Sequence, residues 1–294
     1  MILLLLSILC SSGIYVVFKL FSKFGINTFQ AITVNYYVAA AFGFWYVGDF
    51  TAVRGTFDEP WLLWAVIIGL LFISLFYIMA LTSQGFGVTV ASVASKMSMV
   101  IPVAILILID PDEGLTALKA SGVAAGMLAV VLTSAKDGKS QTTEGASVLL
   151  PAVLFLGSGG LDFLLAFVQK NYLETAVQYK LFVPAPFTAA AVAGTAMLIL
   201  RSSKKRQPLE WKNFAAGFVL GMINYGSIYF VLRVIGSGIL DRSSAIPANN
   251  IGIVLLSALI GTAAFGERLS AKNMIGVILA VVSIGLLTFK SMGF

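Results

Sequence analysis

The sequence predicts an all-α integral membrane protein with ten membrane-spanning helices, arranged as two inverted repeats of five helices each. Three observations lead to this fold class. Hydrophobic residues make up 59% of the 294 residues and charged residues only 11%, whereas soluble domains carry about 25% charged residues. The apolar residues fall into ten long runs, and the two halves of the chain share short phrases at matching places. The composition also excludes a disordered or collagen-like chain.

Each apolar run is long enough to cross a bilayer as a helix, which takes about 20 residues. The runs are continuous rather than alternating, which argues against a transmembrane β-barrel. The first run lacks a clear small-residue cleavage site, so we expect it to form a helix rather than a signal peptide. All four tryptophans lie near span ends, where an indole ring favours the membrane interface: Trp45, Trp61, Trp64 and Trp211. The predicted spans are residues 2–20, 29–47, 61–81, 88–109, 115–134, 146–168, 177–200, 214–234, 239–265 and 271–289.

Several classes of function are excluded by what the sequence lacks. The single cysteine, Cys10, cannot form an internal disulfide, and the absence of histidine removes His-based catalysis, zinc sites and haem ligation. No GxSxG or GxxxxGK[ST] motif is present, so we expect no enzyme activity, no cofactor and no direct use of ATP. The net charge of +6 is spread between apolar runs, which favours the positive-inside effect over nucleic-acid binding.

The internal repeat is clearest before the fifth and tenth predicted spans. Glu113 stands three residues before Thr116, and Glu267 stands three residues before Ser270, each with a leucine in between. Thr116 and Ser270 are placed to cap the helices that follow. The two glutamates lie at helix starts, where a carboxylate favours the positive end of the helix dipole. We therefore expect both glutamates to be structural, with a gating role as the alternative.

Matching glycines extend the repeat into the spans themselves. Gly122 and Gly276 are related by the same shift of 154 residues, and Gly122 forms a GxxxG pair with Gly126 that allows two helices to approach closely. The predicted repeats are residues 1–140 and 141–294. Because each copy has five spans, an odd number, the second copy enters the membrane from the opposite side. Inverted repeats of this kind place a substrate near the midplane between the copies, although a bundle without transport remains an alternative.

The order of the spans, the acidic-Leu-Thr/Ser phrases and the Gly-rich turns before the fourth and ninth spans resemble EamA-type proteins of the drug/metabolite transporter (DMT) superfamily. The similarity covers nearly the whole chain and departs from the family pattern at Asp112, where the second copy has Gly266. The resemblance implies a central cavity between the repeats. It further implies a secondary active transporter, commonly an exporter, of amino acids or other small organic metabolites, working by alternating access.

The resemblance places the chain as a multi-pass protein of the bacterial inner (cytoplasmic) membrane, with both termini in the cytoplasm. The basic cluster at residues 201–212 favours the opposite orientation by the positive-inside rule, so the orientation stays open. Expected partners are a small-molecule metabolite and membrane lipid, with protons as a candidate coupling ion and no nucleic acid. The chain is either a monomer or a homodimer. Two other functions stay open: a flippase for a lipid-linked substrate, and a membrane assembly subunit that transports nothing.

Two ionisable residues lie near the middles of predicted spans, Lys96 in the fourth and Asp162 in the sixth. An ionisable group there costs at least about 2.5–3.5 kcal/mol, so it usually faces a cavity or a partner. In one interpretation, Lys96 binds a carboxylate or phosphate of the substrate, and Asp162 binds a substrate amine or the coupling proton. In the other, the two side chains pair with each other and lock two helices together.

Asn249 and Asn250 follow Pro247 in the ninth span and match the position of Lys96 in the repeat, while Pro102 follows Lys96 by nearly two turns. A proline in a membrane helix leaves a backbone carbonyl without its usual partner. We therefore expect a broken or bent helix beside the substrate, with a packing kink and asparagines bonding between helices as the alternative.

The remaining predicted substrate-binding residues are tyrosines and one asparagine within apolar spans. Their side chains suit a pocket for an aromatic or amphipathic ligand, and hydrogen bonds between helices are the competing explanation. We assign no catalytic or metal-binding residue. The set consists of Asn224, Tyr225 and Tyr229 in the eighth span, Tyr36 in the second and Tyr77 in the third.

Overall fold

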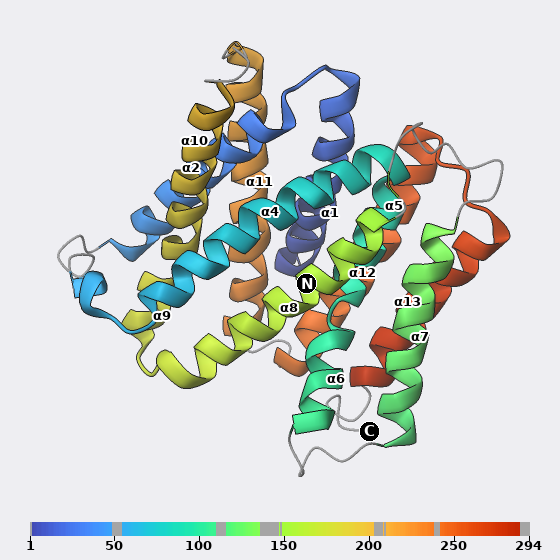
Figure 1. Ribbon diagram of the computed structural model, residues 1–294. Helices are drawn as coiled ribbons and strands as arrows, with labels where there is room; N and C mark the ends of the chain where they lie inside the picture. The colour runs from blue at the N-terminus through green and yellow to red at the C-terminus, as the bar shows by residue number, and fades with distance from the viewer. Residues whose placement is uncertain are drawn as a thin grey trace. The chain divides into compact units, whose positions relative to one another are not determined.

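The computed structural model describes residues 2–48, 55–109, 116–135, 147, 149–202, 208, 210–237 and 242–288. This part of the chain is helical and contains no β-strand (Figure 1). Nine of the helical segments within it are long and apolar enough to cross a membrane. The chain is therefore a multi-pass membrane protein built from helices.

Most predicted spans correspond to a single helix, and two are divided into two helical pieces. The helices in chain order are α1 (Ile2–Lys23), α2 (Thr28–Val47), the short 3₁₀ helix η1 (Gly55–Asp58), α4 (Leu62–Phe86), α5 (Val88–Met97), α6 (Val100–Ile109), α7 (Ala117–Ser134), α8 (Leu149–Tyr172), α9 (Ala176–Phe182), α10 (Pro184–Ser202), α11 (Trp211–Gly236), α12 (Arg242–Phe265) and α13 (Ala271–Thr288).

Nine of the ten predicted spans are confirmed as apolar helical segments of spanning length within the described ranges. The exception is the second predicted span. Its residues form a helix, α2, but α2 is not among the nine. Polar side chains such as those of Gln30, Thr33 and Asn35 lower its mean hydropathy. These three polar side chains are buried, so α2 places them against other helices.

The fourth predicted span is broken at Ser98 and Met99, between α5 and α6. Pro102 explains the position of the break, because its nitrogen cannot donate to the Ser98 carbonyl and its ring would clash with that group. The Ile101 N–H donates to the Ser98 oxygen instead, at 2.9 Å. The predicted break is thus confirmed here. In the ninth span, α12 runs unbroken through Pro247, so no break is found there.

The described helices pack into two compact units, and each unit contains segments from both predicted repeats. The predicted repeat boundary between residues 140 and 141 lies outside the described residues, so the repeats themselves stay a prediction. Unit 1 comprises Met1–Leu20, Ile78–Asp162 and Gly226–Phe294, and unit 2 comprises Phe21–Tyr77 and Phe163–Tyr225.

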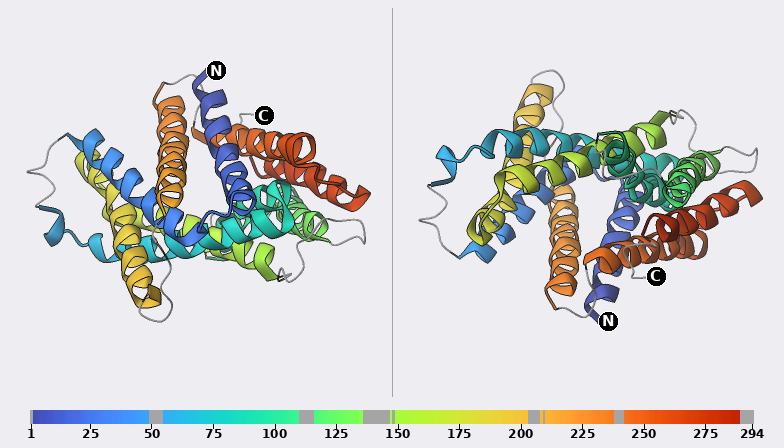
Figure 2. Two further views of the ribbon diagram at one scale, coloured as in Figure 1. Left: turned by 90° about the horizontal axis from the view of Figure 1, so that it is seen from above. Right: turned by 90° about the horizontal axis from the view of Figure 1, so that it is seen from below.

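In unit 1, α7 and α13 lie side by side and form its most extensive helix pair (Figure 1, Figure 2). Their closest approaches are reciprocal. A Cβ atom on Gly122 would come within 2.8 Å of the Leu287 side chain, and one on Gly276 within 2.7 Å of the Thr133 nitrogen. A shift of 154 residues takes Gly122 to Gly276 and Thr133 to Leu287. The contact of Gly122 with Leu287 and the contact of Gly276 with Thr133 are therefore the same contact, made once in each direction between the two helices.

A second pair of contacts between α7 and α13 follows the same shift. The Ser283 hydroxyl donates to the Gly122 carbonyl at 2.7 Å. A Cβ atom on Gly276 would lie 3.0 Å from the Ala129 carbonyl, and Ala129 precedes Ser283 by 154 residues. These close approaches confirm the packing role predicted for Gly122 and show the same role for its match in the repeat, Gly276.

In unit 2, α2 and α10 form the most extensive helix pair, and their closest approaches are reciprocal as well. A Cβ atom on Gly43 would come within 2.9 Å of the Pro184 side chain, and one on Gly194 within 2.7 Å of the Thr33 hydroxyl. A shift of 151 residues takes Gly43 to Gly194 and Thr33 to Pro184. The geometry of this pair therefore repeats the pattern seen between α7 and α13.

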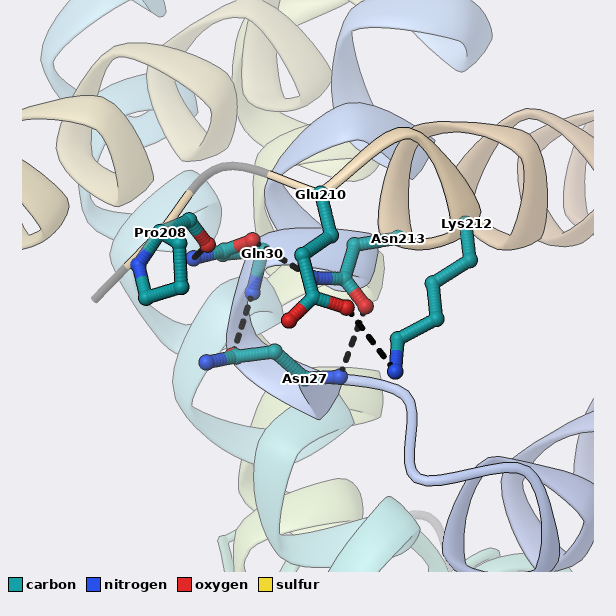
Figure 3. A network of polar contacts seen from close by, with 6 residues as sticks. All are labelled: Asn27, Gln30, Pro208, Glu210, Lys212 and Asn213. Carbon is teal, nitrogen blue, oxygen red and sulfur yellow. Dashed lines mark hydrogen bonds and ion pairs between the residues drawn. The ribbon is translucent and has the colours of Figure 1, made fainter.

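The starts of α2 and α11 in unit 2 are tied together by buried amides (Figure 3). The Asn27 N–H donates to the Asn213 side-chain oxygen at 2.9 Å, and the Asn27 side chain caps α2 by accepting from the Gln30 N–H at 3.1 Å. The Asn213 amide donates to the Gln30 side chain at 2.7 Å, and the Gln30 amide donates to the Pro208 carbonyl. The bond from the Gln30 N–H satisfies one of the N–H groups that the first turn of a helix leaves without a partner, and the other bonds join the two helix starts.

Both predicted helix caps in unit 1 are confirmed. The Thr116 hydroxyl accepts from the Lys119 N–H at the start of α7, and the Ser270 hydroxyl accepts from the Asn273 N–H at the start of α13. The Asn273 side chain also joins the two helices. Its amide donates to three carbonyl oxygens at the end of α7, those of Leu132, Thr133 and Ala135.

Candidate functional site

The break between α5 and α6 lies against α8, in unit 1. The Ser98 hydroxyl lies 2.6 Å from the Ser95 carbonyl oxygen and 3.1 Å from Asp162 Oδ2, so it can donate to either. Gly159, one turn before Asp162 on α8, permits this approach, because a Cβ there would come within 2.8 Å of the Ser98 carbonyl. The glycine thus acts in packing, and it places the predicted carboxylate beside the interrupted span.

Lys96 precedes the same break by two residues, at the end of α5. It exerts an electrostatic attraction on Asp162. However, no ion pair of 4.0 Å or less joins Lys96 and Asp162 in the described structure. The Lys96 side chain is half-buried and that of Asp162 is exposed in the isolated chain. Each charge can therefore interact with an opposite charge on a ligand, and the direct pairing expected for a helix lock is not present.

The predicted asparagines of α12 lie near the same break. The Asn250 amide nitrogen is 3.8 Å from the Met99 sulfur, between α5 and α6. Asn249 is also buried, and its side-chain oxygen has no hydrogen-bond partner. A buried polar atom without a partner costs about 1–3 kcal/mol. The structure therefore brings Lys96, Asp162 and Asn250 to one region, with an unsatisfied acceptor on the residue next to Asn250.

Unit 2 holds a separate group of predicted residues. The Asn224 amide donates to the Asn35 side-chain oxygen at 3.1 Å, which is the interhelical hydrogen bond considered as the alternative to substrate binding. The Asn35 amide nitrogen is buried without a partner. Tyr36 is buried as well, its hydroxyl has no partner, and its ring stacks on those of Phe72 and Phe187.

The three other predicted tyrosines pack against aromatic neighbours. Tyr77 meets the edge of Phe29, with ring centroids 5.6 Å apart, and Tyr225 stacks on Phe42 at 5.5 Å. Both of these contacts are within unit 2. Tyr229, in unit 1, has the neighbouring ring of its own helix, that of Phe230, at 5.5 Å. These ring contacts are aromatic packing, and the predicted role of the three tyrosines in substrate binding stays a prediction.

The sequence missed one functional candidate, the role of Glu267. We predicted a structural carboxylate at the start of the helix that follows it, and the structure adds a contact with a different helix. The carboxylate accepts from the backbone N–H groups of Val88 at 2.5 Å and Thr89 at 3.2 Å, at the start of α5. The Thr89 hydroxyl donates to it at 2.7 Å. The available signal was Gly87, which begins α5 without a side chain that could cap it. Glu113, the counterpart in the first repeat, lies outside the described residues.

A small cavity of about 50 Å³ lies beside this carboxylate, with Lys19, Arg268 and Asn273 among the residues that line it. That volume suffices for one or two water molecules. Among the described residues, Cys, Asp and Glu side chains do not gather in groups of three that could hold a metal ion. Two polar features of unit 1 are thus candidates for function: the broken span with its charges and the capped start of α5.

Comparisons with known proteins name no activity. No family model matches the chain. An uncharacterised protein of Haemophilus influenzae is 29% identical over 290 residues, which cover 96% of this chain and 95% of that protein. A solved crystal structure of a protein superimposes with a TM-score of 0.60 at 16% identity, covering 100% of this chain and 98% of that one. At this identity, the chain is similar to that structure in fold alone.

Proposed function

We propose that this chain is a secondary active transporter of the EamA type, in the DMT superfamily. It carries a small organic metabolite across the bacterial inner membrane by alternating access. The observation that carries the proposal is the presence of Lys96 and Asp162 within apolar spans without an ion pair between them. Each such group costs at least about 2.5–3.5 kcal/mol. A charged ligand offsets that cost, whereas a purely structural bundle gains nothing from it.

The reciprocal helix contacts support two inverted repeats. An internal two-fold axis makes every contact between the two copies occur twice. If position i of the first copy contacts position j of the second, then position j of the first copy also contacts position i of the second, as in a symmetric dimer. The pairs α7 with α13 and α2 with α10 follow this rule at shifts of 154 and 151 residues. α5 also contacts α12, and these helices belong to the fourth and ninth spans, which occupy matching places in the two proposed repeats. Five spans in each repeat then require opposite orientations.

The chemistry of the broken span supports a polar, charged ligand. Lys96 would bind a carboxylate or phosphate, because an ammonium carries three donors and no acceptor. Asp162 would bind an amine or take up and release a coupling proton, with Ser98 as its neighbour at 3.1 Å. Asn249 and Asn250 would supply amide groups to the same ligand. The energy comes from the gradient of protons or of the substrate itself, and the chain performs no enzymatic step.

A thermal-shift screen of the purified protein against amino acids, amines, nucleosides and organic acids tests the proposal. A ligand at 100 times its Kd stabilises the folded state by about 2.7 kcal/mol. We expect one chemical class to raise the Tm of the wild type and to lose this effect in Lys96→Ala and Asp162→Asn. The exposed-residue variants Lys170→Ala and Asp58→Asn serve as matched controls and should keep it. A shift that survives both site variants would contradict the charged site.

A further inference from the structure

The start of α5 depends on a side chain from elsewhere in the chain. Its N-cap residue is Gly87, which has no side chain, and the first N–H groups of a helix have no partner within it. Glu267 supplies the missing acceptor to Val88 and Thr89, and it also accepts from the Thr89 hydroxyl. Hydrogen bonds to a carboxylate are stronger than neutral ones, and a negative charge is favoured at a helix start.

The backbone around Glu267 is built to leave room for this carboxylate. Gly266, with a φ of 64°, ends α12 in the left-handed conformation, and the Glu267 N–H donates to the Gly261 carbonyl at 2.9 Å. This turn folds Glu267 back along α12. A Cβ on Gly87 would lie 2.5 Å from Glu267 Oε1, and one on Gly261 would also collide with the carboxylate. Glycines at two distant positions thus make space for one side chain.

The helix held in this way is short and carries the predicted site at its other end. α5 has 10 residues, which makes it about 15 Å long. Its first seven residues are all buried. At its far end, Lys96 and Ser98 flank the last residue, and Ser98 contacts Asp162. We therefore expect a displacement of the first turn to change where the last turn lies against α8.

We propose that Glu267 is a positioning residue for the Lys96–Asp162 site. By holding the first turn of α5 against the end of α12, it fixes the distance between Lys96 and Asp162, although it touches neither of them. The significance for transport rests on the proposed function, in which this site binds and releases a ligand. The positioning itself is a mechanical property of α5 and can be measured without any ligand.

Hydrogen–deuterium exchange of the purified protein tests the positioning. In Glu267→Ala, we expect the amide of Ile101, at the break beyond the far end of α5, to exchange at least tenfold faster than in the wild type. If Glu267 acts only as a cap of the first turn, the exchange pattern should be different. If faster exchange is confined to residues 87–91 while Ile101 is unchanged, Glu267 merely caps the first turn, and the positioning role is wrong.

Further variants separate the positioning effect from a general loss of folding in Glu267→Ala. Glu267→Gln keeps one acceptor oxygen and should show a smaller effect. Gly261→Ala leaves Glu267 intact but displaces its carboxylate, so it should reproduce the faster exchange at Ile101. Gly285→Ala is the matched glycine control, because a Cβ at Gly285 meets nothing within 4 Å, and it should leave the exchange unchanged. A normal exchange pattern in Gly261→Ala would overturn the proposal.

A chemical probe reads the position of residue 96 directly. In a Cys10→Ser background, the labelling rate of Lys96→Cys with N-ethylmaleimide should change at least fivefold when Glu267→Ala is added. Glu210→Gln, at an exposed ion pair with Lys212, should leave the rate unchanged. An unchanged rate with Glu267→Ala would refute the positioning role. Because neither readout involves a substrate, failure of the transport proposal leaves both results interpretable, and failure of the positioning leaves the transport proposal standing.

Discussion

Replacing Asn273 should destabilise the pairing of α7 with α13 more than its single side chain suggests. The Asn273 oxygen accepts from the Ser270 N–H at 3.0 Å, so the two residues form a reciprocal cap at the start of α13. Its amide nitrogen, with two hydrogens, serves three carbonyl oxygens at the end of α7 at 2.9–3.2 Å. Asn273→Ala removes the side-chain half of the cap and all donors to these carbonyls.

The expected loss follows from these bonds. The lost half of the cap is worth about 0.5–1 kcal/mol, and each of the two amide hydrogens about 0.5–1.5 kcal/mol. The total is about 1.5–4 kcal/mol, with a further contribution from buried carbonyls left without partners. Asn273→Asp keeps the acceptor for Ser270 but turns a second oxygen toward the α7 carbonyls. The aspartate should therefore be at least as destabilising as the alanine.

Equilibrium unfolding in mixed SDS and mild-detergent micelles measures these free energies. Asn171→Ala is the matched control, because the exposed Asn171 amide bonds only to Phe167 of its own helix, and its change should stay within about 0.5 kcal/mol. A loss below 1 kcal/mol for Asn273→Ala, or an aspartate variant as stable as the wild type, would refute the reasoning.

Three further predictions concern packing and buried polar atoms. Gly276→Ala should lower the free energy of unfolding by about 2–3 kcal/mol and Gly122→Ala by about 1 kcal/mol, because the added Cβ meets fixed backbone at Thr133 in one case and a mobile leucine side chain in the other. Equal losses in the same unfolding assay would contradict this. Tyr36→Phe should stabilise the protein by up to about 1 kcal/mol by removing a buried hydroxyl without a partner, and a loss of stability would reveal a missed bond. Asn224→Ala should lower the free energy of unfolding by about 1–3 kcal/mol and raise the hydrogen exchange of neighbouring amides, because it leaves the Asn35 oxygen unsatisfied. No change in either measurement would show that this hydrogen bond does not contribute to stability.

The features that the sequence predicted correctly are local ones. Hydropathy along the chain identifies apolar helices without knowledge of their neighbours, which is why nine spans are confirmed. The caps at Thr116 and Ser270 depend on residues three positions apart. The break near Lys96 follows from Pro102, which acts on the carbonyl four residues earlier.

The features that the sequence missed depend on distant contacts. Glu267 and α5 are 178 residues apart at the Thr89 contact, and no local pattern links them. Trp61 is fully buried and meets the edge of Phe182 at 5.6 Å, a contact between residues 121 positions apart that no local pattern predicts. The site residues were chosen by polarity alone, and polarity cannot distinguish Asn224, which bonds across helices, from Lys96, which has no ion-pair partner within 4.0 Å among the described residues.

The most direct test of the transport proposal is solute flux into proteoliposomes containing the purified protein. The solute is the one that raises the Tm in the thermal-shift screen, supplied with a radioactive label, and the variants are Lys96→Ala, Asp162→Asn and the double mutant. We predict saturable uptake by the wild type, at least tenfold loss in each single variant and no recovery in the double mutant. Recovery in the double mutant, or uptake by the wild type no faster than in protein-free liposomes, would contradict the account.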